Sequence, residues 1–292
     1  MRGMNVLEIL REALDAVGDR TAIQRYRRVR GGDINESFFV QSERQPYFVK
    51  MRRTYPPRFF HCEAAGLEAL RQTEAVHVPA VYGAKETKDY GVLVLEWIEG
   101  NETSQTAEQL GRAVAKLHQC EGPAFGFAED NFIGLLPQQN GWYASWIDYY
   151  RERRLFPQMK RAEEKGRMPL ARRKKLEALM SSLEKWLPKD ASPSLLHGDL
   201  WGGNWLAGAN GVPYLIDPAV FYGHHEFEIA FTELFGGFPQ RFYEAYNEQR
   251  PLSPEYEERK PLYQLFYLLV HLNLFGETYG RAVDRILERY VG

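Results

Sequence analysis

One segment of this chain, His197–Asn204, constrains its fold and chemistry more than any other, because of an aspartate thirteen residues beyond it. The segment reads His-Gly-Asp-Leu-Trp-Gly-Gly-Asn, and Asp217 follows within Tyr-Leu-Ile-Asp-Pro. An aspartate, an asparagine five residues later and a second aspartate at the end of a short strand have the spacing of a phosphoryl-transfer site. We therefore expect a fold that brings Asp199, Asn204 and Asp217 together.

Each of these three residues has a predicted role. Asp199 is the expected catalytic base, which accepts the proton of the acceptor hydroxyl. Asn204 and Asp217 supply oxygen ligands, which Mg²⁺ prefers, and the phosphates of ATP fill further positions around the ion. His-Gly-Asp alone would more often be a simple turn, since glycine and aspartate both favour tight loops. The interpretation therefore requires a nucleotide site upstream.

The first hundred residues carry three features that a nucleotide site needs. Gly31 and Gly32 lie in a polar turn between two extended segments, where backbone amides can approach phosphate oxygens. Lys50 lies near the end of the next predicted strand and can bridge phosphates as a point charge. Glu63, early in a helix predicted over 59–73, can form an ion pair with Lys50. Each feature alone is common, but together and in this order they predict an ATP-binding lobe.

Two further strands are expected near residues 80–84 and 91–97, where the chain reads Glu96-Trp97-Ile98. We expect this segment to be a hinge between two lobes, with the backbone groups of Glu96 and Ile98 bonded to the edge of adenine. Recognition by backbone groups leaves no trace in the sequence, so this prediction rests on position alone.

Beyond the hinge the hydrophobic pattern is mainly helical. Helices are expected over 105–119, 142–165, 169–187, 226–235, 239–248, 261–276 and 280–290, with short strands between 195 and 217. A first helix is expected over 4–17. The order predicts an α+β, bilobal, protein-kinase-like fold with a small N-terminal antiparallel sheet lobe, residues 1–98, and a larger mainly helical catalytic lobe, residues 99–292.

Composition excludes several classes of protein. A formal net charge of −2 gives no electrostatic case for nucleic acid or an anionic membrane as a partner. The most apolar stretch, residues 262–275, is too short to span a bilayer, and Glu8 and Arg11 interrupt any N-terminal signal core. Cys62 and Cys120 have no metal-type spacing and do not make a disulfide framework. We therefore expect a soluble, cytoplasmic enzyme.

These motifs resemble the fructosamine kinase family, which is similar to the aminoglycoside phosphotransferases and shares the protein-kinase-like fold. The resemblance rests on the segment 197–204, Asp217-Pro218-Ala219, Phe221-Tyr222-Gly223-His224, Glu226-Phe227-Glu228, Phe235-Gly236-Gly237-Phe238-Pro239 and residues scattered over 126–142. It covers essentially the whole chain from the glycine turn onward. The Asp-Leu-Trp and Phe-Tyr-Gly-His elements are specific, whereas the bare His-Gly-Asp is shared by the wider superfamily.

The resemblance implies ATP-dependent phosphorylation of the 3-hydroxyl of ketosamines, which are sugar adducts of protein lysines or free amines. The phosphorylated adduct is unstable, and its breakdown restores the amine, so the implied role is deglycation. By the same resemblance Lys50 and Glu63 are the phosphate-binding pair. Some family members carry a cysteine in the glycine turn, where this chain has Asp33, so no redox switch is expected there.

The acceptor side of the site is less defined by the sequence. Trp201, next to the predicted base, can stack on a sugar face, and lobe packing is an equal alternative. For His224, hydrogen bonding within a loop is favoured over sugar contact, and a metal role for it and His225 is disfavoured. Buried or structural positions are expected for Trp142, Trp146, Tyr149 and Glu228.

Two alternatives remain at this level. The first keeps the fold and changes the acceptor to an aminoglycoside, choline or another alcohol. Glu226, Glu228 and Glu233 lie among aromatic residues, which suits a less charged sugar better than a polycation. The second is a nucleotide-binding pseudokinase scaffold, which a complete set of five site residues disfavours. The preferred ketosamine and the oligomeric state do not follow from the sequence.

Overall fold

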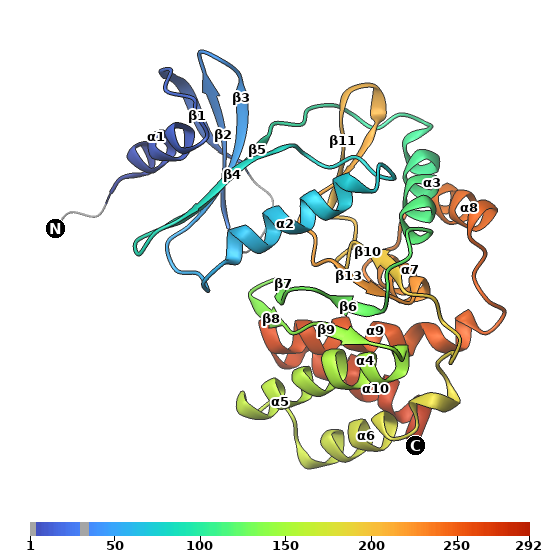
Figure 1. Ribbon diagram of the computed structural model, residues 1–292. Coiled ribbons are helices and arrows are strands. Elements are labelled where there is room, and N and C mark those ends of the chain that lie inside the picture. The colour runs from blue at the N-terminus through green and yellow to red at the C-terminus, as the bar shows by residue number, and fades with distance from the viewer. Residues whose placement is uncertain (1–3, 30–34) are drawn as a thin grey trace.

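A computed structural model describes residues 4–29 and 35–292, and it has the expected α+β, bilobal architecture (Figure 1). A small antiparallel sheet with two helices forms the N-terminal part, and a larger, mainly helical part follows. Gly31 and Gly32 of the predicted phosphate turn lie outside the described residues.

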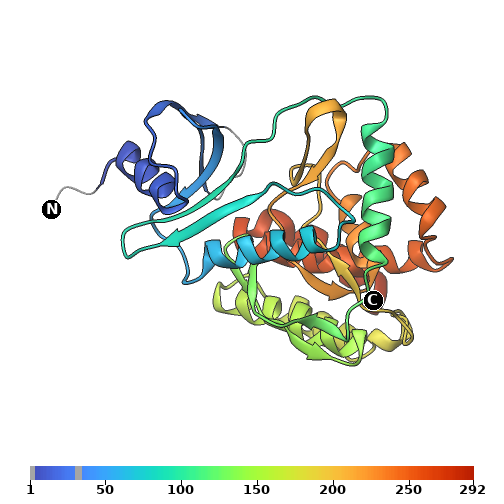
Figure 2. The ribbon, with the colours of Figure 1, turned by 45° about the horizontal axis from the view of Figure 1, so that its top comes forward.

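The N-terminal sheet has five strands in the order β1-β2-β3-β5-β4. Their bounds are β1 Ile23–Val29, β2 Glu36–Ser42, β3 Pro46–Arg52, β4 Val81–Glu86 and β5 Gly91–Glu96. One face of the sheet packs on α1 (Val6–Ala16). A capping box of reciprocal hydrogen bonds between Asn5 and Glu8 caps the N-terminus of this helix. On the other face α2 (Phe59–Gln72) lies against β4 and β5 (Figure 2).

Strand alternation decides to which face of the sheet each residue of β3 points. Val49 and Met51 on β3 are buried in the core beside α1. Phe48 and Lys50 therefore point to the opposite face, the one that carries α2. Because α2 covers only the β4–β5 end of this face, the β1–β3 end remains available to a ligand.

The C-terminal part contains the remaining helices and three small sheets. Its helices are α3 Thr106–His118, α4 Trp146–Tyr149, the π-helix Tyr150–Leu155, α5 Phe156–Glu164, α6 Leu170–Met180, α7 His225–Thr232, α8 Gln240–Gln249, α9 Tyr256–Phe275 and α10 Gly280–Val291, with 3-10 turns at Leu183–Lys185, Ala209–Gly211 and Glu277–Tyr279. Its strands are β6 Phe125–Phe127, β7 Asn131–Ile133, β8 Leu136–Gln138, β9 Gly141–Tyr143, β10 Ser194–Leu196, β11 Trp205–Ala207, β12 Pro213–Leu215 and β13 Phe221–Gly223. They pair as β10-β13-β6-β9, β11-β12 and β7-β8.

The segment 125–143 differs from the sequence-based expectation. A helix was expected from residue 142, but Trp142 lies in β9 with 47% of its surface exposed. Trp146 and Tyr149 are buried as expected, so the core prediction is wrong for Trp142 alone. The four strands of this segment have three residues each. Such strands are too short for an alternating hydrophobic pattern to appear.

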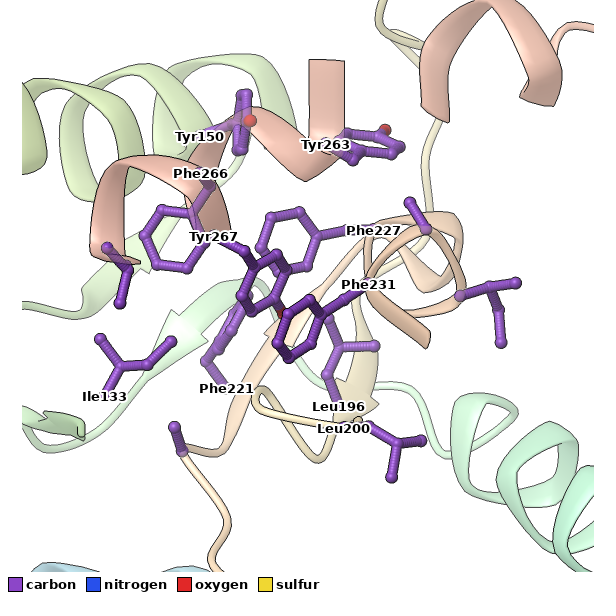
Figure 3. Close-up of a cluster of buried hydrophobic side chains, with 14 of the residues drawn as sticks. Ile133, Tyr150, Leu196, Leu200, Phe221, Phe227, Phe231, Tyr263, Phe266 and Tyr267 are labelled. Atoms are coloured by element: carbon purple, nitrogen blue, oxygen red, sulfur yellow. The ribbon is translucent and has the colours of Figure 1, made fainter. Parts of the chain in front are cut away.

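An aromatic core supports the loop that follows β10 (Figure 3). The rings of Phe231 on α7 and Tyr267 on α9 stack with centroids 3.5 Å apart, and Phe227 packs on the same tyrosine at 5.0 Å. Leu196 and Leu200, on either side of the predicted base, are fully buried. The backbone around Asp199 is thus supported by a closely packed aromatic core.

The connection between the two parts passes β11 and β12. A Cβ atom on Gly100 would lie 1.9 Å from the carbonyl oxygen of Gly208, so these two segments of the backbone are in a close contact that only glycine permits. The predicted lobe division after residue 98 falls in this connection, two residues past the end of β5, and stays a prediction. In the described residues, no helix has both the length and the apolar character that a membrane crossing requires.

Candidate active site

The loop 197–204 joins β10 to β11 and lies directly against the segment that carries Asp217. Gly198 has φ +85°, and a Cβ atom on it would lie 2.0 Å from the carbonyl oxygen of Ala219. The backbone N–H of Ala219 donates to the carbonyl of His197 at 2.8 Å. Only glycine allows this approach at position 198, which explains the His-Gly-Asp sequence.

His197 is a buried positioning residue. Its Nε2 lies 2.8 Å from the carbonyl oxygen of Ile216, and its Nδ1 lies 3.3 Å from the backbone nitrogen of Asp199. Because a carbonyl only accepts and a backbone N–H only donates, the ring is neutral with its proton on Nε2. Burial lowers the pKa of His197, which agrees with the neutral form. The imidazole therefore connects the two aspartate-bearing segments.

Glu228 on α7 accepts hydrogen bonds from the backbone of the same loop. Its Oε2 accepts the backbone N–H of His197 at 3.0 Å, and its Oε1 accepts that of Gly198 at 2.6 Å. His118 on α3 contributes a third hydrogen bond, 2.9 Å from Nε2 to Oε2. Although burial opposes ionisation, the bond from His118 keeps the pKa of Glu228 below its usual value. The carboxylate thus satisfies two loop amides that would otherwise be buried without partners.

The structural role expected for Glu228 agrees with this position, but its bonds to the loop did not follow from the sequence. Its partners are backbone amides and one distant histidine, and neither leaves a recognisable spacing. The hydroxyl of Tyr267 completes the support by donating to the carbonyl oxygen of Gly198 at 3.0 Å.

Asp199 and Asn204 are brought together as their spacing predicts. The Asn204 side-chain amide donates to the backbone carbonyl of Asp199 at 2.7 Å and to its Oδ2 at 3.0 Å. Burial and the nearby charge of Asp217 raise the pKa of Asp199 to about 7, against the lowering effect of the Asn204 bond. A carboxylate with this pKa is suited to accept a proton near neutral pH.

Lys50 lies between two carboxylates. Its Nζ is 2.5 Å from Oε1 of Glu63 and also contacts Oδ1 of Asp217, and its side chain is almost fully buried. Burial alone would lower the pKa of Lys50, but the two carboxylates raise it above its usual value, so the ammonium stays charged. The predicted ion pair between Lys50 and Glu63 is confirmed.

Asp217 adopts a left-handed backbone conformation, with φ +58°. The preceding residue, Ile216, donates its N–H to the carbonyl of Asn204 at 3.0 Å, so the second aspartate is fixed relative to the asparagine. About a third of the Asp217 side chain is exposed.

The donor atoms here fit Mg²⁺. Asp217 offers carboxylate oxygens, and the Oδ1 of Asn204 accepts no hydrogen bond from the residues that the structure describes. Lys50 is paired with the carboxylates of Glu63 and Asp217, and the charge of Asp217 also acts on a third carboxylate, that of Asp199. Such an excess of oxygen ligands and negative charge favours a bound divalent cation.

The two predicted hinge residues differ in their free backbone groups. The N–H of Glu96 donates to the carbonyl of Ala80 at 2.9 Å, and its carboxylate accepts the N–H of Ala80 at 3.0 Å. In contrast, no hydrogen bond to the Ile98 backbone occurs among residues 4–29 and 35–292. The position of Ile98 therefore suits a ligand-binding hinge, whereas the N–H of Glu96 is already used within the sheet.

The two predicted acceptor residues occupy different environments. Trp201, two residues after Asp199, exposes 40% of its surface. His224 is 93% buried, its Nδ1 lies 2.7 Å from the hydroxyl of Tyr263, and burial lowers its pKa to about 3. The structure thus does not bring His224 into the cleft with the other site residues, and its hydrogen bonding matches the favoured alternative.

His224, His225 and Glu226 have ligand atoms within 4.8 Å of one another, but their bonds argue against a metal. Oε2 of Glu226 pairs with Arg259 at 2.5 Å, and Oε1 accepts the N–H of Ser253 at 2.8 Å. His225 is bonded to Tyr246 at 2.9 Å. The cluster is therefore a hydrogen-bonded part of the core.

Comparison with known proteins agrees with this geometry. The sequence model of the fructosamine kinase family matches residues 6–292. The chain is 41% identical over 264 residues to an Enterococcus faecium protein named "Probable ketoamine kinase", covering 89% of this chain and 93% of the relative. It is 34% identical over 285 residues to the chloroplastic protein-ribulosamine 3-kinase of Arabidopsis thaliana, covering 97% of this chain and 87% of the relative.

A solved structure is also similar along its whole length. A candidate fructosamine-3-kinase from Haemophilus somnus superimposes with a TM-score of 0.86 at 30% sequence identity, covering 97% of each chain. The aminoglycoside phosphotransferase APH(4)-Ia superimposes with a TM-score of 0.65 at 16% identity, covering 98% of this chain and 99% of that protein, which supports the fold alone. On these findings the chain belongs to the fructosamine kinase family.

Proposed function

We propose that this chain transfers the γ-phosphoryl group of ATP, with Mg²⁺, to the 3-hydroxyl of ketosamines and thereby starts their removal from amines. Membership of the fructosamine kinase family makes the chain an ATP-dependent phosphotransferase that acts on a hydroxyl group. The observation that carries the proposal is the meeting of Lys50, Asp199, Asn204 and Asp217 in one cleft.

The proposed roles follow from the position and charge of each side chain. Lys50, oriented by Glu63, binds phosphate oxygens of the nucleotide. Asn204 and Asp217 would hold Mg²⁺, which would supply positive charge against the phosphates. Asp199 orients the acceptor hydroxyl and takes its proton as the bond from oxygen to phosphorus forms and ADP leaves.

The nature of the acceptor is supported by the relatives and by one exposed side chain. The bacterial and plant relatives are named for ketoamines and protein-bound ribulosamine. Trp201 lies two residues from Asp199 and exposes enough of its indole ring to stack on a sugar. The carboxylates that follow Asp217 already have partners: Glu226 pairs with Arg259, Glu228 accepts two loop amides and Glu233 pairs with Lys260. They are therefore not free to bind a polycationic aminoglycoside.

The test is a coupled assay of ADP release with Mg²⁺ and ATP on four acceptors: ribulose-lysine, fructose-lysine, choline and kanamycin. Asp199→Asn is the blank. We expect turnover on one or both ketosamines alone, followed by appearance of free lysine amine as the phosphorylated adduct decomposes. Turnover on choline or kanamycin alone would contradict the proposed ketosamine acceptor but would still support the phosphotransferase activity. No turnover with any acceptor, although ATP binds, would support the scaffold alternative.

The compartment and the form of the substrate belong to the same proposal. A cytoplasmic enzyme would meet adducts of both free amines and proteins. Parallel assays with ribulosylated lysozyme and ribulose-lysine would rank the protein-bound and free forms by their kcat/KM values.

A further inference from the structure

A hollow of about 220 Å³ lies between the first strands of the N-terminal sheet and the segment after β5. The described residues that line it are Arg25, Tyr26, Arg27, Phe39, Trp97 and Glu99. None of these was assigned a role in the site described above. Two of them, Arg25 and Arg27, place their guanidinium groups near the same aromatic ring, that of Phe39.

The hollow shares a face of the sheet with Lys50. In the strand register Arg27 pairs with Phe39, Phe39 with Phe48, and Phe48 with Leu95. The row that contains Lys50 is two residues away along β3, on the same face. Two residues of a strand span about 6–7 Å. A ligand whose phosphates reach Lys50 would therefore place a neighbouring group at the row of Arg27 and Phe39.

The side chains of the hollow form a stack of guanidinium and aromatic groups. The rings of Phe39 and Trp97 meet edge to face with centroids 4.7 Å apart. The guanidinium carbon of Arg27 lies 5.1 Å from the Phe39 centroid and 5.6 Å from the Trp97 ring. The guanidinium carbon of Arg25 lies 5.4 Å from the same Phe39 centroid. Phe39 consequently exposes only 7% of its surface, whereas both arginines remain exposed.

The charge of the hollow suits a flat ligand attached to an anion. Neither Arg25 nor Arg27 forms an ion pair with any residue in the described ranges. A guanidinium that is held on an aromatic ring presents its second planar face for stacking. The backbone of Ile98, which accepts and donates no hydrogen bond within the described chain, lies between Trp97 and Glu99, which both line the hollow. A nucleotide base has a flat face that can stack on the guanidinium and polar edges that can bond to the backbone of Ile98.

We propose that Arg27 is a base-binding residue of the nucleotide site: its guanidinium, held by Phe39 and Trp97, stacks on the base of ATP. This inference rests on the proposed use of ATP but not on the identity of the acceptor. The stack contributes affinity through the base, and Lys50 contributes it through the phosphates, so the two effects are separable by ligands that lack one or the other.

The experiment is calorimetric titration of the full chain with Mg²⁺–ATP and, separately, with Mg²⁺–tripolyphosphate, which has the phosphates without the base. Arg27→Ala removes the stack, and Arg27→Lys keeps the charge without the planar group. Arg28→Ala is the matched control, because Arg28 is the next residue on β1, carries the same charge and pairs loosely with Glu36 at 3.9 Å. Thermal unfolding of each variant establishes that it is folded.

For ATP we expect the Kd to rise about 3- to 30-fold in both Arg27 variants, the range that a cation–π contact contributes. Tripolyphosphate binding should change by less than about twofold, and Arg28→Ala should leave both ligands unaffected. An equal loss of affinity for tripolyphosphate would identify Arg27 as a phosphate ligand and overturn the proposal. So would wild-type affinity for ATP in Arg27→Lys, or tighter binding in Arg27→Ala. Failure of the wild-type chain to bind ATP would instead overturn the proposed function.

Discussion

The ammonium group of Lys50 contacts the carboxylate of Asp217, although the two residues are 167 positions apart and lie on different parts of the fold. The contact joins the sheet of the N-terminal part to the loops of the C-terminal part. It also keeps the proposed Mg²⁺ ligand paired before the nucleotide binds. Binding of Mg²⁺–ATP would give each group a new partner, phosphate for the lysine and metal for the aspartate.

Glu63 should therefore determine how well Lys50 serves the nucleotide. Glu63→Gln keeps the shape of the side chain and removes its charge, so the lysine loses one of its two partners. We expect the KM for ATP to rise about 10- to 150-fold, the effect of losing a charge-assisted hydrogen bond, with a smaller change in the KM for the acceptor. Steady-state kinetics with each substrate varied in turn give both constants.

The control for this variant lies on the same helix. Glu68→Gln removes a carboxylate that pairs with Arg71 at 2.6 Å on the exposed side of α2. Exposed pairs contribute little, so its kinetics should match the wild type. An unchanged KM for ATP in Glu63→Gln would show that Lys50 is positioned without this carboxylate.

Asp199→Asn tests the proposed base directly. The asparagine can still accept the hydrogen bond from Asn204 but takes no proton from the acceptor. We expect kcat to fall by about 10²- to 10⁴-fold. The Kd for Mg²⁺–ATP should stay within a few-fold of the wild type, as measured by calorimetry. Turnover close to the wild-type rate would remove Asp199 from its role.

The pKa of Asp199 also predicts how activity and stability depend on pH. As a base, this group works when ionised, so kcat/KM for the acceptor should fall as pH decreases through about 7. The stability of the fold should depend on pH in the opposite direction, falling as pH rises. The pKa rises from 3.8 to about 7 on folding, so the folded state binds the proton more readily and loses stability as pH rises between these values.

Asp199→Asn removes this titration and should be more stable than the wild type at pH 8. We expect a difference of about 1–2 kcal/mol in the free energy of unfolding, after allowance for the partial exposure of the carboxylate. The difference should shrink towards pH 4. Urea unfolding at pH 4, 6 and 8 measures it, and a difference that grows at low pH would contradict the raised pKa.

Glu228 should affect turnover without affecting nucleotide binding. Glu228→Gln leaves one of the two amides at positions 197 and 198 without an acceptor, which costs about 1–3 kcal/mol. We expect a lower Tm and a kcat reduced about 10-fold or more by displacement of the loop, with little change in the Kd for ATP. Glu233→Gln, which loses its pair with Lys260 but touches no loop amide, should lower Tm without lowering kcat. Equal kcat in both variants would make Glu228 a purely structural residue.

The residues that meet in the site were predictable, because their types and order along the chain reflect the chemistry proposed for them. Lys50, Glu63, Asp199, Asn204 and Asp217 are examples. The bonds of Glu228 to the loop, and the location of Arg27 over Phe39, were not predicted. The bonds of Glu228 are to backbone amides, which no residue type in the sequence identifies. The contact of Arg27 with Phe39 depends on the register of two paired strands, which the spacing of the residues does not give.

The fold shows the same division. The long helices and the five-stranded sheet have hydrophobic patterns over many residues, and their positions follow the sequence closely. Between residues 125 and 143 each strand is three residues long, and Gly126 and Gly141 have positive φ values of 120° and 82°. The pattern there reflects tertiary contacts, so local periodicity gave a helix start at Trp142, where the structure has a strand.

Trp201 allows a last test of the acceptor site. If its indole stacks on the sugar, Trp201→Ala should raise the KM for the preferred ketosamine about 2- to 12-fold, the order of a single aromatic ring contact, and Trp201→Phe should restore part of the affinity. The KM for ATP should not change. Trp142→Ala is the matched control, because this tryptophan is equally exposed but lies on β9. A rise in KM for both substrates in Trp201→Ala, or none at all, would favour the packing alternative, since only a direct contact with the sugar affects the acceptor selectively.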